Sequence, residues 1–403
     1  MRHRVNRGKR RLRWGSLIGC CAILFLYLTA ESLSAPRRGG IYRRALSQPP
    51  QSLDPARATT TFAGTVIHQV FDGLVEFDNE LGVRPALAKF WNASPDGRVW
   101  TFQLRRGVRF HHGREMVADD VVYSFTRLLD PNYRSPWSWL FKRVLGADAF
   151  RIGRADQVAG FEILDRYSLR ITLTEPYAPF VHQLGMTAAK IVPRDEVERL
   201  GAAFGRQPVG TGPFRFSAWQ PNGPIRLQAY ETYFEQRPYL DQIHFRIFSS
   251  GQLSDAWRAF EQGELEEAKI PIRERQRVLQ DQTSRYRFVE KALLATLFLL
   301  LDVQSEPLQN PKVRQAINYA IDRETINRDV RQNRFRTAKG ILPLGMPGYN
   351  FNLDGYAYDV ERAKRLLAEA GYPDGKGLSP LELWTSSKSE TVRKEHAAIK
   401  RYL

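Results

Sequence analysis

"GRVWTFQLRRGVRFHHGREMVADDVVYSF", residues 97–125, places a strand pattern, two turns and a helix pattern in immediate succession. Apolar and polar residues alternate over 100–104, which predicts a strand with one buried face. Turns follow at "RRG" and "HHG", and Asp119 or Asp120 can cap the helix that comes next. Its apolar face is made of Val121, Val122, Phe125, Leu128 and Leu129. The stretch therefore predicts a strand–turn–helix unit.

Strand and helix patterns interleave along the rest of the chain. Strands are expected from Ile41 and at "GLVEFD" (73–78), "SLRITL" (168–173), "FRFSAW" (214–219), "IRLQAY" (225–230), "IHFRIF" (243–248) and "TLFLLLDV" (296–303). Helices are expected at "TVIHQVF" (65–71), "LSDAWRAFEQG" (253–263), "PKVRQAINYAI" (311–321) and "DVERAKRLLAEAG" (359–371). This mixture predicts an α/β or α+β protein.

The composition favours a large folded body with a basic surface. A length of 403 residues is more than one core usually serves, so two or three domains are expected. Apolar residues at 43% and aromatic residues at 12% exclude wholesale disorder. The net charge is +17, but the basic residues of the body are scattered singly or in pairs. This scatter indicates a solvated surface and argues against a nucleic-acid-binding protein.

The residues that usually carry chemistry form no catalytic or metal-binding pattern. Both cysteines, Cys20 and Cys21, lie in an N-terminal apolar run, which excludes disulfides, thiolate metal sites and a cysteine nucleophile from the body. His111 and His112 are adjacent and favour a turn that exposes two polar rings over a metal site. No HExxH or GxSxG motif occurs, and the glycine-rich "GTGPF" lacks the lysine of a phosphate loop. We therefore expect a binding protein without metal or cofactor, and no enzyme.

The first 35 residues have the pattern of a targeting segment. Basic residues precede the uncharged run "WGSLIGCCAILFLYLTA" (14–30), and small and polar residues follow it. Residues 1–35 therefore predict a secretory signal peptide and a periplasmic or extracytoplasmic body. An uncleaved membrane anchor formed by 14–30 is the first alternative. The second is lipid attachment at "LIGC" (17–20), although most of the apolar run follows that cysteine.

The opening stretch also carries a family resemblance. "FWNASPDGRVWTFQLRRGVRFHHGREMVADDVVYSFTRLLDP" (90–131) resembles the signature region of the bacterial extracellular solute-binding proteins of family 5. These proteins are receptors of ABC importers for oligopeptides, dipeptides and nickel. Four further segments are similar and follow in the order of the family: 52–78, 208–248, 310–326 and 358–377. The resemblance covers nearly all of 40–385.

The resemblance implies the fold: an α/β, two-lobed periplasmic binding protein type II fold with an extra inserted subdomain. Lobe one would comprise 36–80 and 193–270, and the inserted subdomain 81–192. Lobe two would comprise 271–403 and would be incomplete, because family members continue well beyond the position of Leu403. In peptide-binding members the continuation also carries an acidic residue that pairs with the amino terminus of the ligand.

The resemblance also implies a ligand site in the cleft between the lobes. Thr59 and Thr61 fall where a loop supplies backbone contacts to an extended peptide. Trp137, in "SPWSW", falls at an aromatic side of the pocket. Asp302, at the end of "TLFLLLD", falls where many members have asparagine. Ordinary packing or surface exposure is the alternative for each of these four residues.

We expect a monomeric receptor that binds a peptide or another small solute and delivers it to ABC permease subunits in the inner membrane. Oligopeptides or dipeptides are the expected ligands. The alternatives are a receptor for nickel or another small solute, a truncated membrane-anchored relative without transport activity, and a basic nucleic-acid binder.

Overall fold

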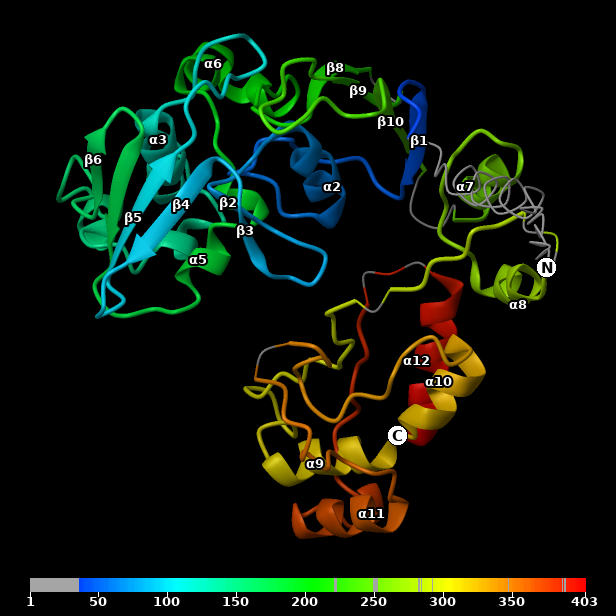
Figure 1. The fold of residues 1–403 in the computed structure, drawn as a ribbon. Coiled ribbons are helices and arrows are strands. Elements are labelled where there is room, and N and C mark those ends of the chain that lie inside the picture. The colour runs from blue at the N-terminus through cyan, green and yellow to red at the C-terminus, as the bar shows by residue number, and fades with distance from the viewer. Residues whose placement is uncertain are drawn as a thin grey trace, which may run out of the picture. The chain divides into compact units, whose positions relative to one another are not determined.

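The computed structural model describes residues 36–220, 223–248, 253–281, 283, 285–291, 293–346, 348–385, 387 and 389–403. The targeting segment and its alternatives thus lie outside the described residues. The chain divides into two compact units (Figure 1). Unit 1 contains Pro50–His244 and the chain up to Tyr42, and unit 2 contains Arg43–Pro49 and Phe245–Leu403. The division into these two units does not test the predicted lobe boundaries, which stay a prediction.

The described residues form three sheets. The strands are β1 (Ile41–Leu46), β2 (Val75–Phe77), β3 (Val83–Pro85), β4 (Ala88–Ala93), β5 (Val99–Leu104), β6 (Phe161–Asp165), β7 (Ser168–Thr172), β8 (Phe214–Trp219), β9 (Ile225–Ala229) and β10 (Gln242–Ile247). The sheet orders are β1-β10-β9-β8, β2-β3 and β4-β5-β7-β6. In the third sheet every neighbouring pair is antiparallel.

Helices occur in both units. Unit 1 has α2 (Thr61–Val70), α3 (Ala118–Leu129), α4 (Ala147–Arg151), α5 (Phe180–Gln183) and α6 (Arg194–Leu200). Unit 2 has α7 (Leu253–Glu261), α8 (Arg275–Gln280), α9 (Pro311–Ala320), α10 (Arg323–Arg331), α11 (Val360–Glu369) and α12 (Glu390–Tyr402). Short 3-10 helices span Ser138–Phe141, Thr187–Ala189, Gly201–Gly205, Ile272–Glu274 and Pro373–Gly375. The predicted mixture of helices and strands is confirmed. Within the described ranges, no helix has the length and apolar character needed to cross a membrane.

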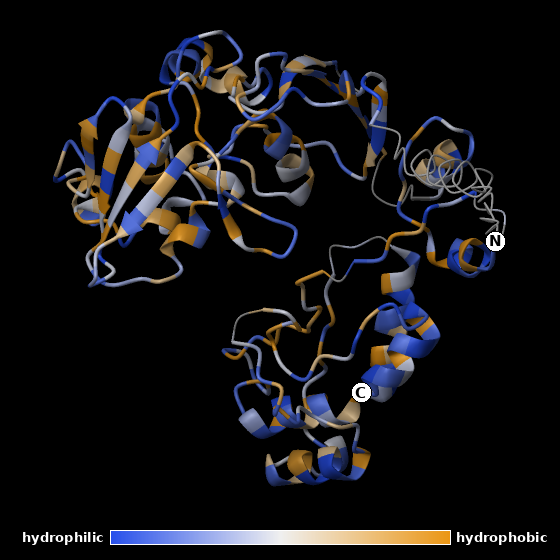
Figure 2. Cartoon of the chain, in the orientation of Figure 1, coloured by the Kyte–Doolittle hydropathy of each residue, from blue (hydrophilic) through white to orange (hydrophobic). Residues whose placement is uncertain are grey.

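The opening stretch forms the predicted strand–turn–helix unit. β5 buries Trp100, Phe102 and Leu104 and leaves its other residues half-buried, as the alternation predicts. Figure 2 shows the alternating hydropathy along the strands of the sheet β4-β5-β7-β6, to which β5 belongs. Phe125 of α3 is fully buried and packs on Phe141, with ring centroids 4.4 Å apart. The stretch is therefore scaffold, and its apolar side chains belong to a buried core of unit 1.

The start of α3 differs in detail from the prediction. The N-cap residue is Val117, which has no side-chain oxygen. Asp120, inside the first turn, accepts a hydrogen bond from the Val117 N–H at 3.0 Å and so satisfies this donor from within the helix. Arg114 donates to both oxygens of Asp120, at 3.0 and 2.6 Å, and this charge-assisted pair fixes the carboxylate.

The paired histidines lie on the predicted turn and His112 is exposed, but His111 is half-buried, so the expectation of an exposed ring is wrong for His111. The His111 backbone N–H donates to the Gly210 carbonyl at 2.8 Å, and its Nε2 lies 2.9 Å from the Gly212 carbonyl. A Cβ at Gly212 would lie 2.6 Å from the Val70 carbonyl carbon, so the glycine lets this loop approach the end of α2. His112 faces Asp195, with 3.0 Å between Nε2 and Oδ2. Hydrogen bonds from His111 therefore join the "HHG" turn (111–113) to the "GTG" loop (210–212).

The strand expected at 296–303 is absent from the described part of unit 2. Leu297 and Leu300 are 69% and 88% exposed, and no described strand pairs with them. An isolated segment lacks the cross-strand bonds that hold a strand, so its apolar run alone does not form one. Leu381 and Trp384 are also exposed, at 40% and 83%. One buried core cluster of this unit lies between helices that include α9 and α12.

Phe125 should be far more important for stability than an exposed residue of the same type. Phe125→Ala removes a fully buried ring from the packed core, which should cost about 3–5 kcal/mol of unfolding free energy. Phe90→Ala is the matched control, because Phe90 is 50% exposed, and it should cost less than about 1 kcal/mol. Denaturant unfolding followed by circular dichroism measures both. Equal losses would contradict the proposed core.

His111 should make unit 1 less stable as the pH falls. Burial of the ring lowers the pKa of His111 from 6.5 to about 4. The folded state therefore binds fewer protons than the unfolded state between these values, so stability is lost as the pH falls from 6.5 towards 4. His111→Gln should lower stability at neutral pH but flatten its pH dependence in this window. If the unfolding free energies of the unaltered chain and of His111→Gln changed equally with pH between 6.5 and 4, His111 would not cause the loss of stability.

Candidate functional site

A buried ion pair fixes the polar loop that precedes α2. The Arg127 guanidinium of α3 donates to both oxygens of Asp54, at 2.7 and 3.2 Å, and both side chains are buried. Tyr133 also donates its hydroxyl proton to Asp54. Burial alone would lower the pKa of Arg127, but the nearby Asp54 carboxylate has the larger combined effect and raises this pKa. Burial and the same carboxylate raise the pKa of Tyr133 to about 12, so this phenol remains a donor.

The segment that follows Tyr133 binds the same loop at two carbonyl groups. Ser135 Oγ donates to the Ala56 carbonyl at 2.7 Å, and the Trp137 indole Nε1 donates to the Ala58 carbonyl at 2.8 Å. Trp137 is half-buried, and its ring lies 6.2 Å from that of the more exposed Trp139. These contacts place an aromatic pair beside the backbone of the loop.

Thr59 and Thr61 lie directly after the bound carbonyl of Ala58. α2 begins at Thr61, earlier than the expected 65–71, because Thr60 Oγ1 accepts a hydrogen bond from the Ala63 N–H at 3.2 Å. The side chains of Thr59 and Thr61 are exposed. Within the described ranges the backbone N–H and C=O of Thr59 make no hydrogen bond. The structure thus brings three of the four predicted site residues, Thr59, Thr61 and Trp137, to one place in unit 1.

Asp302, the fourth predicted residue, lies in unit 2. Its carboxylate accepts from the Gln304 N–H at 3.0 Å and from the Ser305 hydroxyl, and these bonds lower the pKa of Asp302. The side chain thus closes a local turn, a common use of aspartate. Its role as a ligand contact stays a prediction.

A buried polar cluster in unit 1 was missed by the sequence patterns. The Asp72 carboxylate accepts from Thr211 Oγ1 at 2.8 Å and from the Tyr233 hydroxyl at 3.2 Å. Burial raises the pKa of Asp72, and burial lowers the pKa of Lys190, whose side chain is also buried. Residues this far apart in sequence give no spacing signal. The cluster ties the "GTG" loop to the chain after α2, and this makes it structural support.

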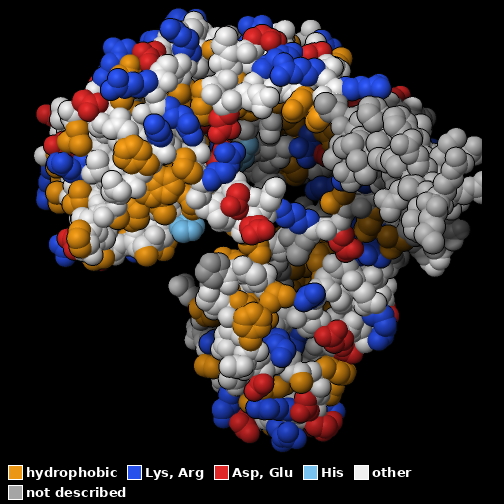
Figure 3. All heavy atoms as spheres, in the orientation of Figure 1, with side chains coloured by type: hydrophobic (Ala, Val, Ile, Leu, Met, Phe, Trp, Pro, Cys, Tyr) orange, Lys and Arg blue, Asp and Glu red, His pale blue; other side chains and the backbone are white. Residues whose placement is uncertain are grey.

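The described residues contain no group of three or more histidine, aspartate and glutamate side chains placed to hold a metal ion. On the face shown in Figure 3, lysine and arginine side chains are interspersed with aspartate and glutamate. The geometry at Thr59 and Trp137 offers backbone groups and aromatic faces, which suit binding of an extended chain.

Comparison with known sequences gives consistent matches. Residues 82–403 match the family described as "Bacterial extracellular solute-binding proteins, family 5 Middle". The chain is 33% identical over 321 residues to the heme-binding protein A of Haemophilus influenzae, covering 76% of this chain and 57% of that protein. It is 32% identical over 353 residues to the dipeptide-binding protein of Escherichia coli, covering 83% of this chain and 63% of that protein. The chain therefore spans less than two thirds of the length of these relatives.

The solved structures that match this chain are also solute-binding proteins. The periplasmic binding protein DppA from Helicobacter pylori, in complex with the peptide STSA, has a TM-score of 0.76 and 30% identity. It covers 91% of this chain, which in turn covers 72% of it. The periplasmic oligopeptide-binding protein OppAIV from Borrelia burgdorferi has a TM-score of 0.77 and 28% identity, with 90% of this chain and 72% of that one covered. The predicted two-lobed binding-protein fold is confirmed by these matches.

Removing the cation of the buried pair should destabilise unit 1 strongly. Arg127→Met leaves the Asp54 carboxylate buried without its charge partner, which should cost about 3–5 kcal/mol. The double variant Asp54→Leu/Arg127→Met should lose less, because no unpaired charge remains.

The matched control is Arg170→Met, which breaks the exposed pair with Glu162 and should cost less than about 1 kcal/mol. All three variants can be compared by urea unfolding. If Arg127→Met and Arg170→Met lost the same stability, the ion pair would not hold the loop.

Proposed function

The chain belongs to family 5 of the bacterial extracellular solute-binding proteins, and on this basis we propose that it is a peptide receptor of an ABC importer. It acts outside the cytoplasm as a monomer and delivers oligopeptides or dipeptides to permease subunits in the inner membrane. Several relatives are named for dipeptides, for di- and tripeptides and for glutathione, which supports a peptide ligand. All of these relatives are named as binding proteins, which supports a role without catalysis.

The observation that carries the proposal is the hydrogen bond from Trp137 to the Ala58 carbonyl. It holds an aromatic ring beside the open backbone of Thr59. An extended peptide can donate to the Thr59 carbonyl and accept from its N–H, as a strand added to an edge does. Thr61, the exposed first residue of α2, gives a further polar contact. Such main-chain pairing is the same for most peptide sequences, so the receptor tolerates varied side chains.

The lobes are part of the same proposal. Lobe one comprises 36–80 and 193–270, with the inserted subdomain at 81–192, and lobe two begins at 271. Thr59 belongs to lobe one, and Trp137 belongs to the subdomain. Asp302 is the contribution of lobe two to ligand binding.

Changes at Thr59 should separate backbone from side-chain recognition. Thr59→Pro removes the N–H donor and should weaken binding of the dipeptide Ala-Phe at least tenfold, about 1.4 kcal/mol. Thr59→Val is the matched control, because it keeps the N–H and removes only the hydroxyl. Trp137→Ala should weaken binding similarly, whereas Trp384→Ala, at an exposed tryptophan of unit 2, should not.

Isothermal titration calorimetry with the full chain measures these affinities, and thermal unfolding checks that each variant is folded. The proposal fails if the unaltered chain binds no dipeptide or tripeptide. It also fails if Thr59→Pro and Thr59→Val bind Ala-Phe equally well.

A further inference from the structure

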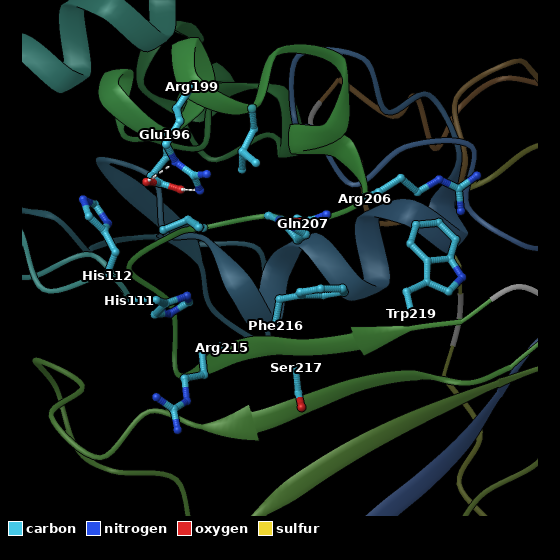
Figure 4. Close-up of a pocket in the computed structure, with 13 residues that line it drawn as sticks. His111, His112, Glu196, Arg199, Arg206, Gln207, Arg215, Phe216, Ser217 and Trp219 are labelled. Atoms are coloured by element: carbon cyan, nitrogen blue, oxygen red, sulfur yellow. Dashed lines mark hydrogen bonds and ion pairs between the residues drawn. The ribbon is translucent and has the colours of Figure 1, made fainter.

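A cavity of about 570 Å³ lies in unit 1, between α6, the chain that follows it and strand β8 (Figure 4). Arg199, Arg206, Arg215, Phe216 and Trp219 contribute to its walls. None of its lining residues belongs to the site at Thr59 and Trp137. We propose that this cavity is a second binding site, which takes a small organic anion with a carboxylate or phosphate group attached to an apolar body.

The charge of the cavity is positive and incompletely neutralised. Among the described residues that line the cavity, the acidic one is Glu196. Arg199 donates hydrogen bonds of 2.5 and 3.0 Å to both oxygens of its carboxylate. Arg206 and Arg215 have no carboxylate within ion-pair distance in the described part of the chain. Arg215 instead donates to the neutral amide oxygen of Gln228 at 3.0 Å. Figure 4 shows Arg215 directed to the side of β8 opposite Phe216, so the guanidinium of Arg206 is the one that remains for an anion.

Arg206 is held in a form suited to anion binding. Its guanidinium carbon lies 3.8 Å from the ring centroid of Trp219, and Figure 4 shows the two groups stacked together. Stacking occupies one flat face of the guanidinium and leaves the N–H donors at its edge. These donors match both oxygens of a carboxylate or a phosphate. The stack orders the side chain in advance, so less conformational entropy is lost on binding.

The histidines of the cavity do not supply this positive charge. Both ring nitrogens of His111 are used, since Nδ1 accepts from the Gly210 N–H at 3.3 Å and Nε2 bonds the Gly212 carbonyl at 2.9 Å. His112 faces Asp195, which also accepts from Arg114. Arg206 is therefore the group that decides which ligand binds.

The size and the aromatic walls define the rest of the ligand. A volume of about 570 Å³ is within the usual range for small-molecule sites. Phe216 and Trp219 give apolar surface next to the arginines, so a bare inorganic ion would leave this surface unused. A ring or alkyl group bonded to the acid fills the space. The volume matches one such small molecule.

The test compares anions on the full chain by isothermal titration calorimetry. The probes are phenylacetate, phenyl phosphate, inorganic phosphate and the neutral phenylacetamide. We expect one molar equivalent of phenylacetate or phenyl phosphate to bind, and the tighter of the two identifies the acid group. Inorganic phosphate and phenylacetamide should each bind at least tenfold more weakly.

Variants locate the binding. Arg206→Gln should weaken binding of the preferred anion at least tenfold, and Arg226→Gln should leave it unchanged. Arg226 is an exposed arginine on the neighbouring strand β9 and does not line the cavity. The thermal unfolding midpoint of each variant shows whether it is folded.

Several results would overturn the proposal: no binding of either organic anion, equal binding by the Arg206→Gln variant, or equal binding of phenylacetamide. Tighter binding of an acidic hexapeptide than of both small anions would also overturn it and would indicate a protein partner. The Thr59 variants and the arginine variant alter different residues, so together they show which of the two sites Ala-Phe or an organic anion occupies.

Discussion

The buried pair of Asp54 and Arg127 is the constraint on which unit 1 depends. Desolvating two charges is costly, and the cost is offset only where the geometry is good and the remaining oxygens are bonded. Both conditions hold, since the contact is bidentate and Tyr133 adds a further donor. The pair joins the loop before α2 to helix α3. The bonds of Ser135 and Trp137 to the same loop follow from this placement.

The two sites proposed for unit 1 would use different chemistry on one scaffold. At Thr59 the proposed binding groups are backbone and aromatic faces, and the nearby Asp54 and Arg127 charges are already paired. At Arg206 the proposed binding group is a guanidinium cation that stacks on Trp219 and has no carboxylate partner in the described part of the chain. Salt should therefore weaken anion binding at the second site far more than peptide pairing at the first. The net charge of +17 alone would not have distinguished them.

Local patterns predicted most of unit 1, and contacts between distant residues could not be predicted. β5 and α3 follow from alternation and a helical apolar face, which depend on neighbours in sequence. Asp54 and Arg127 are 73 residues apart, and no spacing rule connects them. His111 was assigned to an open turn because its partner loop lies about a hundred residues further on. The segment 296–303 has a strand composition, but a strand also needs a partner, and composition does not supply one. For the proposed site, the family resemblance selected Thr59, Thr61 and Trp137 as candidates, whereas the bond from Trp137 to the Ala58 carbonyl beside them emerged only from the structure.

The most direct test of the peptide site is hydrogen–deuterium exchange of the Thr59 amide, measured on the full chain with and without saturating Ala-Phe. If the Thr59 backbone pairs with the peptide, its amide exchanges freely in the absence of the dipeptide and becomes protected when the dipeptide is bound. Unchanged exchange at Thr59 in the presence of a bound dipeptide would contradict the site.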